Sequence, residues 1–238
     1  MLVSKGAPVE LDAHIARASA SVLDLYDAIV PDELGELVRE RARALTLGRV
    51  RFTLAPHAGG PLKVEIVASE VDAAAVFPTW ERGAALRSFV VSSGLGMHKW
   101  ADRAELDMLE RGLGTGRIAL LVDATGEVLE ASRANVCAID GDLVITPPAD
   151  GRILEGVARA RAIAAARSLG IEVREEALTL ERLITAGEAF LTGSVRGMEP
   201  VRTVDDAALR PPGELLGELA AQVKQLWLGE TPAGARAS

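Results

Sequence analysis

Hydrophobic and polar positions repeat with two different periods along the chain, and these periods mark helices and strands. Apolar residues recur at helical spacing from Leu11 to Ile29, and Pro31 precedes a second stretch of the same kind. Two short alternating runs, "GRVRFTLAP" and "PLKVEIVAS", flank "HAGG" and predict a β-hairpin. A further strand is expected within "FPTWERGAALRSFVVSSGLG". The pattern therefore predicts an α+β first half.

The second half has the same mixture of periods. A helix is expected from about Ala101, and "RIALLVDATGEVLEAS" and "NVCAIDGDLVITPP" then predict two strand pairs of an antiparallel sheet. An Ala- and Arg-rich helix ends at Gly170, strands are expected in "IEVREEAL", "EAFLTGSV" and "MEPVRTVD", and "PGELLGELAAQVKQLWL" predicts a last helix. The whole chain is predicted to be an α+β protein of two domains with a cleft between them.

Glycine-bearing residues 92–96 are the expected connector between the two domains. This interpretation gives an N-terminal domain over residues 1–91 and a C-terminal domain over residues 97–230. The tail, residues 231–238, is expected to be frayed.

Composition narrows the classes of function. A chain of 238 residues, 49% of them hydrophobic and 25% charged, can bury a full core. A formal charge of −8 with interleaved acids and bases argues against a nucleic-acid surface. The single Cys137 excludes an internal disulfide and a cysteine-based metal site, and we expect no metal. No apolar run approaches the roughly 18 residues that span a bilayer, and the start lacks a secretory apolar core. We expect a cytoplasmic protein that binds small molecules.

Two charged residues stand where packing alone does not explain them. Lys99 lies between a histidine and a tryptophan in "GLGMHKWADR", after two glycines and before an amphipathic run. Glu130 lies in "GEVLEASRAN", where a strand should enter the interior of a sheet. Taken singly, Lys99 fits a solvated charge and Glu130 fits a carboxylate paired with Arg133.

Two glycine-bearing segments could bind an anion. In "TPPADGRILEGVARAR" a helix N-terminus would present the main-chain amides of Gly156, Val157 and Ala158 to a phosphate. In "FLTGSVRG" hydroxyl side chains flank Gly193, and one of them is Ser194. Each segment also fits an ordinary turn.

The motifs "HIAR", "HKWADR", "GEVLEASRANV", "TPPADGRILEGVARAR" and "EAFLTGSVRGMEPV" occur in an order and spacing that resembles the class IV aminotransferase family. These are the fold-type IV enzymes that use pyridoxal 5'-phosphate. The similarity runs from about Val9 to Val204 and implies a two-domain, D-amino acid aminotransferase-like fold with the cofactor in the interdomain cleft. Within the family the motifs are most similar to aminodeoxychorismate lyases, and then to branched-chain and D-amino acid aminotransferases.

The resemblance also implies the site residues. Lys99 matches the catalytic lysine that forms a Schiff base with the cofactor, and Glu130 matches the acid that pairs with the pyridine nitrogen. Arg17, in "HIAR", matches the phosphate-binding arginine. Arg196 is a weaker candidate for a contact with a substrate carboxylate. The remaining implied cofactor contacts are Leu154 against the ring, with Gly156, Val157, Ala158, Gly193 and Ser194 around the phosphate.

The implied reaction is elimination of pyruvate from 4-amino-4-deoxychorismate to give 4-aminobenzoate, a step toward folate. Transamination of an amino acid is the alternative, and a non-catalytic protein that binds the cofactor is a third possibility. The chain lacks the strand pair, ending in a motif of the type "GDGVFET", with which family members usually begin. We therefore expect a homodimer in which the partner helps to close the cofactor cleft, with "MLVSKGAPVELD" beside the domain sheet.

Overall fold

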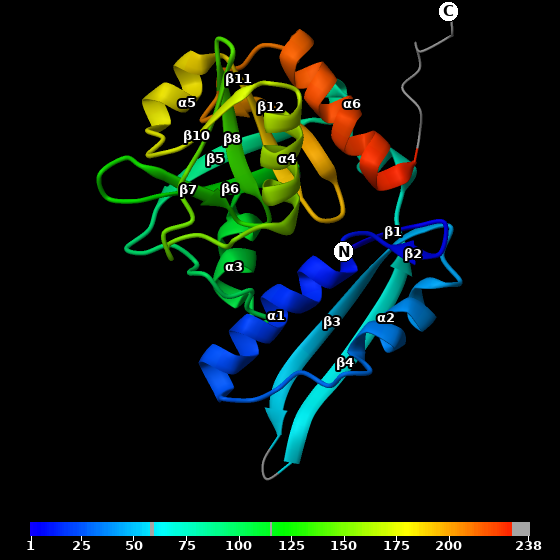
Figure 1. Cartoon of the computed structure of the whole chain (residues 1–238). Coiled ribbons are helices and arrows are strands. Elements are labelled where there is room, and N and C mark those ends of the chain that lie inside the picture. The colour runs from blue at the N-terminus through cyan, green and yellow to red at the C-terminus, as the bar shows by residue number, and fades with distance from the viewer. Residues whose placement is uncertain (58–59, 115, 230–238) are drawn as a thin grey trace, which may run out of the picture. The chain divides into compact units, whose positions relative to one another are not determined.

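The computed structural model describes residues 1–57, 60–114 and 116–229, and Figure 1 shows its helices and strands. The chain divides into two compact units, the first from Met1 to Val76 and the second from Phe77 onward. Each unit has its own sheet and its own hydrophobic core. Across the described residues, no helix is long and apolar enough to cross a membrane.

The first unit is a four-stranded sheet with two helices (Figure 1). Strands β3 and β4 pair antiparallel, which confirms the predicted hairpin. Strand β1 pairs with β3, so the N-terminal residues lie beside this sheet as expected. In sheet order the strands are β2 (Ala7–Pro8), β1 (Leu2–Ser4), β3 (Leu47–His57) and β4 (Gly60–Glu70), and the helices are α1 (Leu11–Tyr26) and α2 (Leu34–Ala42).

Helix α2 shows how the first unit forms its core. Its buried residues are Leu34, Val38 and Ala42, which are four positions apart and so lie on one helix face. These residues belong to one hydrophobic cluster with Val3 of β1 and Val50 of β3. The apolar face of α2, which the amphipathic pattern predicted, therefore packs against the sheet.

The second unit is built on a larger sheet with helices packed on it (Figure 1). In sheet order its strands are β10 (Glu172–Glu175), β9 (Leu143–Thr146), β8 (Asn135–Asp140), β11 (Glu188–Gly193), β12 (Gly197–Val204), β5 (Ala84–Val90), β6 (Arg117–Val122) and β7 (Val128–Ala131), with β13 (Ala207–Ala208) against β12. The helices are α3 (Ala104–Gly112), α4 (Val157–Ser168), α5 (Leu180–Ala186) and α6 (Glu214–Leu228), and two short 3-10 turns are η1 (Ala73–Ala75), in the first unit, and η2 (Trp80–Arg82).

The two predicted strand pairs, β6 with β7 and β8 with β9, are antiparallel as expected, but the sheet of the second unit as a whole is mixed. Strand β5 is parallel to both β6 and β12, and β9 is parallel to β10. Helix α3 separates β5 from β6, and α4 separates β9 from β10. A helix between two neighbouring strands returns the chain to the end where the first strand began, which makes the pair parallel.

The unit boundary lies earlier than residues 92–96. Strand β5 pairs with β12 and β6, so it belongs to the second unit. The glycine-bearing segment is consequently a loop inside the second unit rather than the connector. The sequence gives no local sign of this, because the partners of β5 include a strand more than a hundred residues away. The predicted tail, residues 231–238, lies outside the described residues.

Two smaller differences concern helices. Helix α1 ends at Tyr26, where Asp27 adopts a left-handed conformation with φ +48°, and Ile29 is 86% exposed instead of continuing the apolar face. Helix α5 was not expected. Its N-cap is Thr179, whose side chain accepts the Arg182 N–H at 3.1 Å, and the helix buries Leu183.

Candidate functional site

Glu130 is a buried carboxylate on strand β7. Glu130 is only 3% exposed. Oε1 accepts the backbone N–H of Leu154 at 3.1 Å, and Oε2 lies 3.5 Å from Nδ2 of Asn135. The same Nδ2 donates to the Leu154 carbonyl at 2.9 Å. The alternative prediction, that Glu130 forms an ion pair with Arg133, is wrong, because Arg133 pairs with Glu110 at 3.5 Å.

The surroundings of Glu130 raise the pKa of its carboxyl toward neutral pH. Burial raises the pKa of Glu130 to about 7, against the lowering effects of the Leu154 N–H and of the charges on Lys99 and Arg103. The ammonium group of Lys99 therefore acts electrostatically on this carboxyl. A buried acid that titrates near pH 7 responds strongly to a further cation placed beside it.

Lys99 lies in a loop, residues 91–103, that joins β5 to α3; we call it the lysine loop. The residue is exposed, as are its neighbours Met97 and Trp100. The rings of His98 and Trp100 pack edge to face with centroids 5.9 Å apart. Lys99 is thus an accessible amine on a segment that belongs to neither a helix nor a strand.

A second loop, residues 147–156, connects β9 to α4 and ends at Gly156, the N-cap of α4. A Cβ at Gly156 would lie 2.0 Å from Oδ1 of Asn135, so a glycine is needed for this close approach. Val157 and Ala158 open the helix, and first-turn amides have no partner within a helix. Both their position and the helix dipole suit an anion.

The hairpin of β11 and β12 carries the other predicted phosphate residues. Gly193 pairs with Gly197, and Ser194 lies in the short turn between them. Thr192 of β11 is opposite Asn135 of β8, so these two side chains share a face of the sheet. Among the described side chains, the buried Thr192 hydroxyl has no hydrogen-bond partner.

Arg196 is engaged within the protein. Its Nε donates to Oε2 of Glu199 at 2.6 Å and its Nη2 donates to Oε1 at 2.5 Å. Glu199 is buried, and this bidentate ion pair compensates the free-energy cost of removing its carboxylate from water. The structure thus gives Arg196 an internal partner, and a substrate carboxylate would have to use its remaining N–H groups.

The structure brings several of the predicted residues together in the second unit. Glu130 interacts with Leu154 by a hydrogen bond and with Lys99 through charge, and Asn135 links Glu130 to the loop before α4. Arg17 lies on α1 of the first unit, partly buried, and its part in the site stays a prediction.

Two further residues belong to the site. Asn135 lies inside the quoted "LEASRANV" and was not predicted; its signal is a polar side chain in an apolar strand. Arg103, in the quoted "HKWADR", donates from Nη2 to the Ser132 carbonyl at 2.9 Å and so ties the lysine loop to the segment after Glu130.

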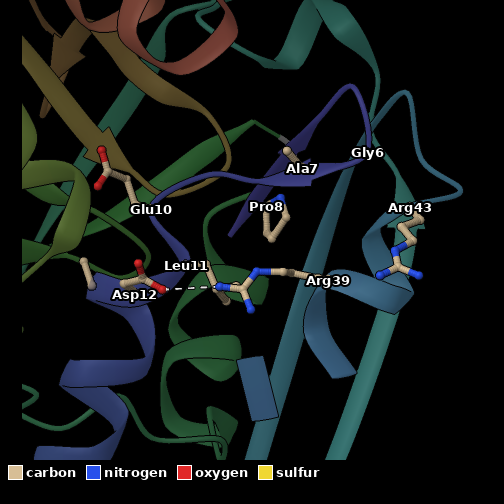
Figure 2. Close-up of a pocket in the computed structure, with 9 residues that line it drawn as sticks. Gly6, Ala7, Pro8, Glu10, Leu11, Asp12, Arg39 and Arg43 are labelled. Carbon is tan, nitrogen blue, oxygen red and sulfur yellow. Dashed lines mark ion pairs between the residues drawn. The ribbon is translucent and has the colours of Figure 1, made fainter. Parts of the chain in front are cut away.

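A pocket of about 510 Å³ lies in the first unit, where Arg39 faces Asp12 at 3.7 Å (Figure 2). Arg39 and Arg43 also lie near Glu36, so the charges on this side are balanced by neighbours. None of the predicted cofactor residues lines this pocket. The pocket is lined by Gly6, Ala7, Pro8, Glu10, Leu11, Asp12, Ala13, Arg39 and Arg43.

The site combines an accessible lysine, a buried acid, and a helix N-terminus whose preceding loop is hydrogen-bonded to that acid through Leu154. This combination meets the needs of an enzyme that holds a phosphorylated aldehyde cofactor. The model of the family described as Amino-transferase class IV matches residues 1–204. The chain therefore belongs to this family, and pyridoxal 5'-phosphate is the family's cofactor.

Three proteins illustrate what the chain is similar to. A "Putative branched-chain-amino-acid aminotransferase" of Methanocaldococcus jannaschii is 36% identical over 107 residues, which are 45% of this chain and 36% of that protein. A "Putative 4-amino-4-deoxychorismate lyase" from Legionella pneumophila superposes with a TM-score of 0.85 at 21% identity, over 94% of this chain and 88% of the other. A "hypothetical aminotransferase" from Mycobacterium tuberculosis in its "PLP-bound form" gives a TM-score of 0.81 at 21% identity, over 96% and 87%.

These likenesses differ in what they establish. The sequence match spans about a third of the curated relative's length. The superpositions establish the fold, which is that of fold-type IV enzymes as predicted.

The donor set of the second unit fits the cofactor. Lys99 offers an amine for the aldehyde, Glu130 offers an acid held by two neighbours, and Val157 and Ala158 offer amides for the phosphate. The unpartnered Thr192 hydroxyl lies on the same sheet face as Asn135. The aldehyde, the ring nitrogen and the phosphate of the cofactor therefore each have a residue suited to them.

Proposed function

We propose that the protein is a pyridoxal-phosphate-dependent aminodeoxychorismate lyase in which Lys99 is the catalytic residue. The observation that carries this proposal is the buried carboxyl of Glu130, which the Leu154 N–H and the Asn135 amide hold in place. The positive charge of exposed Lys99 lowers the pKa of this carboxyl, against the effect of burial. The similarity in fold to a "Putative 4-amino-4-deoxychorismate lyase" supports the choice of reaction within the family.

Each residue has a distinct task in this proposal. Pyridoxal phosphate, when bound, supplies an aldehyde for amines and a ring that accepts electron density. Glu130, as a carboxylate, would keep a proton at the ring nitrogen, and the positive charge of the protonated ring would in turn lower the pKa that burial raises. The amides of Val157 and Ala158, together with Ser194 and Arg17, bind the phosphate.

Lys99 moves the protons of the reaction. Its amine takes the proton from the ring carbon that bears the substrate's amino group, while the bond from the neighbouring carbon to the enolpyruvyl oxygen breaks. The leaving group gains a proton and becomes pyruvate, and the carbon ring becomes aromatic. All atoms of the substrate are found again in the two products, 4-aminobenzoate and pyruvate, so the reaction needs no amino-group acceptor and no oxidant.

The second candidate function is transamination, since the curated relative from Methanocaldococcus jannaschii carries an aminotransferase name. In that reaction the same Lys99 would take the proton from the α-carbon of the amino acid, the cofactor would carry the amino group, and a keto acid would be required as acceptor. A cofactor-binding protein without catalysis is the third possibility.

One assay separates these functions. Purified protein is supplied with the cofactor and 4-amino-4-deoxychorismate, and pyruvate and 4-aminobenzoate are measured with and without a keto acid. Equal amounts of the two products without a keto acid are expected of the lyase. Turnover of amino acids that depends on a keto acid would identify an aminotransferase instead. Cofactor binding without either reaction would contradict both enzymatic proposals.

A further inference from the structure

Residues 150–154, within the loop before α4, contact two of the elements that carry the proposed cofactor residues and lead into a third. We call this segment the linking loop. Its Arg152 carbonyl accepts the N–H of Gly96 in the lysine loop at 3.2 Å. Its Leu154 donates to Glu130 at 3.1 Å and accepts from Asn135 at 2.9 Å. Two residues further on, Gly156 begins α4.

The linking loop is itself held by an ion-pair network. The guanidinium of Arg152 lies 2.8 Å from Asp150, 2.9 Å from Glu127 and 3.3 Å from Asp123. These acids raise the pKa of Arg152 further above its ordinary value, chiefly through the hydrogen bonds that Arg152 donates to Glu127 and Asp150. Glu127 and Asp123 belong to the turn between β6 and β7, which leads into Glu130.

The lysine loop packs on this segment through a glycine. A Cβ at Gly94 would lie 1.7 Å from the carbonyl oxygen of Arg152 and 2.7 Å from its carbonyl carbon. Gly94 does not have the positive φ that favours glycine, whereas Gly96 has φ +78°. The reason for glycine at position 94 is therefore the close approach of two backbones, and not a special dihedral angle.

We infer that the Gly94–Arg152 backbone contact positions the amine of Lys99 relative to Glu130, which makes Gly94 and Arg152 positioning residues of the proposed reaction. The linking loop fixes the carboxyl directly through Leu154 and fixes the lysine loop through the Arg152 carbonyl. One short segment thereby sets the separation of the two reacting groups. This inference rests on the proposed role of Lys99.

The test replaces Gly94 by alanine. Because the obstacle is backbone and not a flexible side chain, the lysine loop has to move on the order of 1 Å, and a displacement of that size can slow a reaction by up to about a hundredfold. Gly112→Ala is the matched control, since nothing lies within 4 Å of a Cβ there and Gly112 also lacks a positive φ.

The readout is the rate of covalent capture of pyridoxal phosphate. Protein freed of cofactor is mixed with pyridoxal phosphate and cyanoborohydride, and labelled lysines are identified by peptide mass spectrometry. Labelling of exposed Lys63 in the same sample serves as the internal reference, because Lys63 lies on β4 of the first unit. We expect Gly94→Ala to label Lys99 at least about tenfold more slowly than wild type or Gly112→Ala, with unchanged labelling of Lys63 and a native circular dichroism spectrum.

Failure of the inference and failure of the proposed function give different results. Lys99 labelled equally fast in Gly94→Ala and wild type would overturn the inference alone. Wild type that shows no preferential labelling of Lys99 would overturn the proposed function and the inference with it. If Gly94→Ala does not fold, Arg152→Gln decides, because it loosens the same loop without a steric clash. Slower labelling of Lys99 in that variant supports the inference, and an unchanged rate overturns it.

Discussion

Lys99 is one of four lysines in the chain, with Lys5, Lys63 and Lys224. An amine held beside the bound cofactor's aldehyde forms the reducible linkage much faster than a surface amine, so Lys99→Ala should abolish the preferential borohydride-reducible adduct and leave the fold intact. Lys63→Ala is the control, since Lys63 is exposed on β4. A reducible adduct that forms in Lys99→Ala at another lysine, faster than the background labelling of Lys63, would show that the catalytic lysine is misassigned.

Arg17 tests whether the first unit takes part in binding. It lies partly buried on α1. Arg17→Ala should weaken the binding of pyridoxal phosphate by about 1.5–3 kcal/mol, the size of a hydrogen bond to a charged group. Titration of cofactor-free protein measures this, with Arg41→Ala, an exposed arginine of α2, as the control.

Since Arg17 also makes an interaction within the protein, the thermal midpoint has to be measured alongside the titration. Unchanged affinity in a folded Arg17→Ala would leave "HIAR" as an ordinary helix face.

Glu130 makes stability depend on pH in the protein without cofactor. Burial raises its pKa from 4.5 to about 7. Between these values the unfolded chain ionises this carboxyl while the folded chain keeps the proton. The free energy of unfolding should therefore fall as the pH rises from 4.5 to 7, by on the order of 3 kcal/mol in total, and the loss should be complete above pH 7.

Urea unfolding of wild type and Glu130→Gln across this pH range measures the effect, since glutamine has a similar shape and does not titrate. The stability of wild type relative to Glu130→Gln should decline with rising pH. A difference that stays constant from pH 4.5 to 7 would contradict the raised pKa.

Residues show why some of the site could be predicted and some could not. Lys99 and Glu130 could be predicted because each lies in a motif whose order and spacing resemble the family, although taken singly Lys99 also fits a solvated charge. The Gly94 contact and the Arg196–Glu199 pair could not be predicted. The first depends on a distant backbone that folding brings against Gly94, and the second on a turn that brings two side chains three positions apart into contact. Residue type alone encodes neither.

At the scale of elements, periodicity predicted the long helices and the β3–β4 hairpin because each depends on neighbouring residues. It failed where partners are distant. The parallel neighbours of β5 and the position of β5 in the second unit depend on strands after residue 116. Helix α5 was missed because a seven-residue element offers too few turns for a helical period to stand out.

Helix α5 nevertheless contributes to the core of the second unit. Leu183 is 0% exposed and belongs to its largest buried cluster. Leu183→Ala should lower the free energy of unfolding by about 2–5 kcal/mol, through lost burial and the cavity left behind. Urea denaturation measures the change, and Glu181→Ala on the exposed side of the same helix is the control. Equal stabilities of the two variants would contradict the packing of α5.

At the scale of the whole molecule, family membership and the surface of the second unit both bear on assembly. Large apolar side chains are exposed at Val90, Met97, Trp100 and Met108, which come from the end of β5, the lysine loop and α3. Exposed apolar side chains concentrated on one stretch of chain are typical of surfaces that bind another protein. A second copy of this chain is the partner that we propose, as for the homodimer expected from the sequence.

The homodimer is tested by light scattering at micromolar concentration, with and without pyridoxal phosphate. Wild type should have twice the mass of the chain, and Met108→Lys should shift the population toward the monomer, because Met108 is 62% exposed and would place a charge in the interface. Leu226→Lys is the matched control, an exposed apolar residue of α6. A monomeric wild type would refute dimerisation. A dimer that tolerates Met108→Lys as well as Leu226→Lys would place the interface on another surface, away from the loop that carries Lys99.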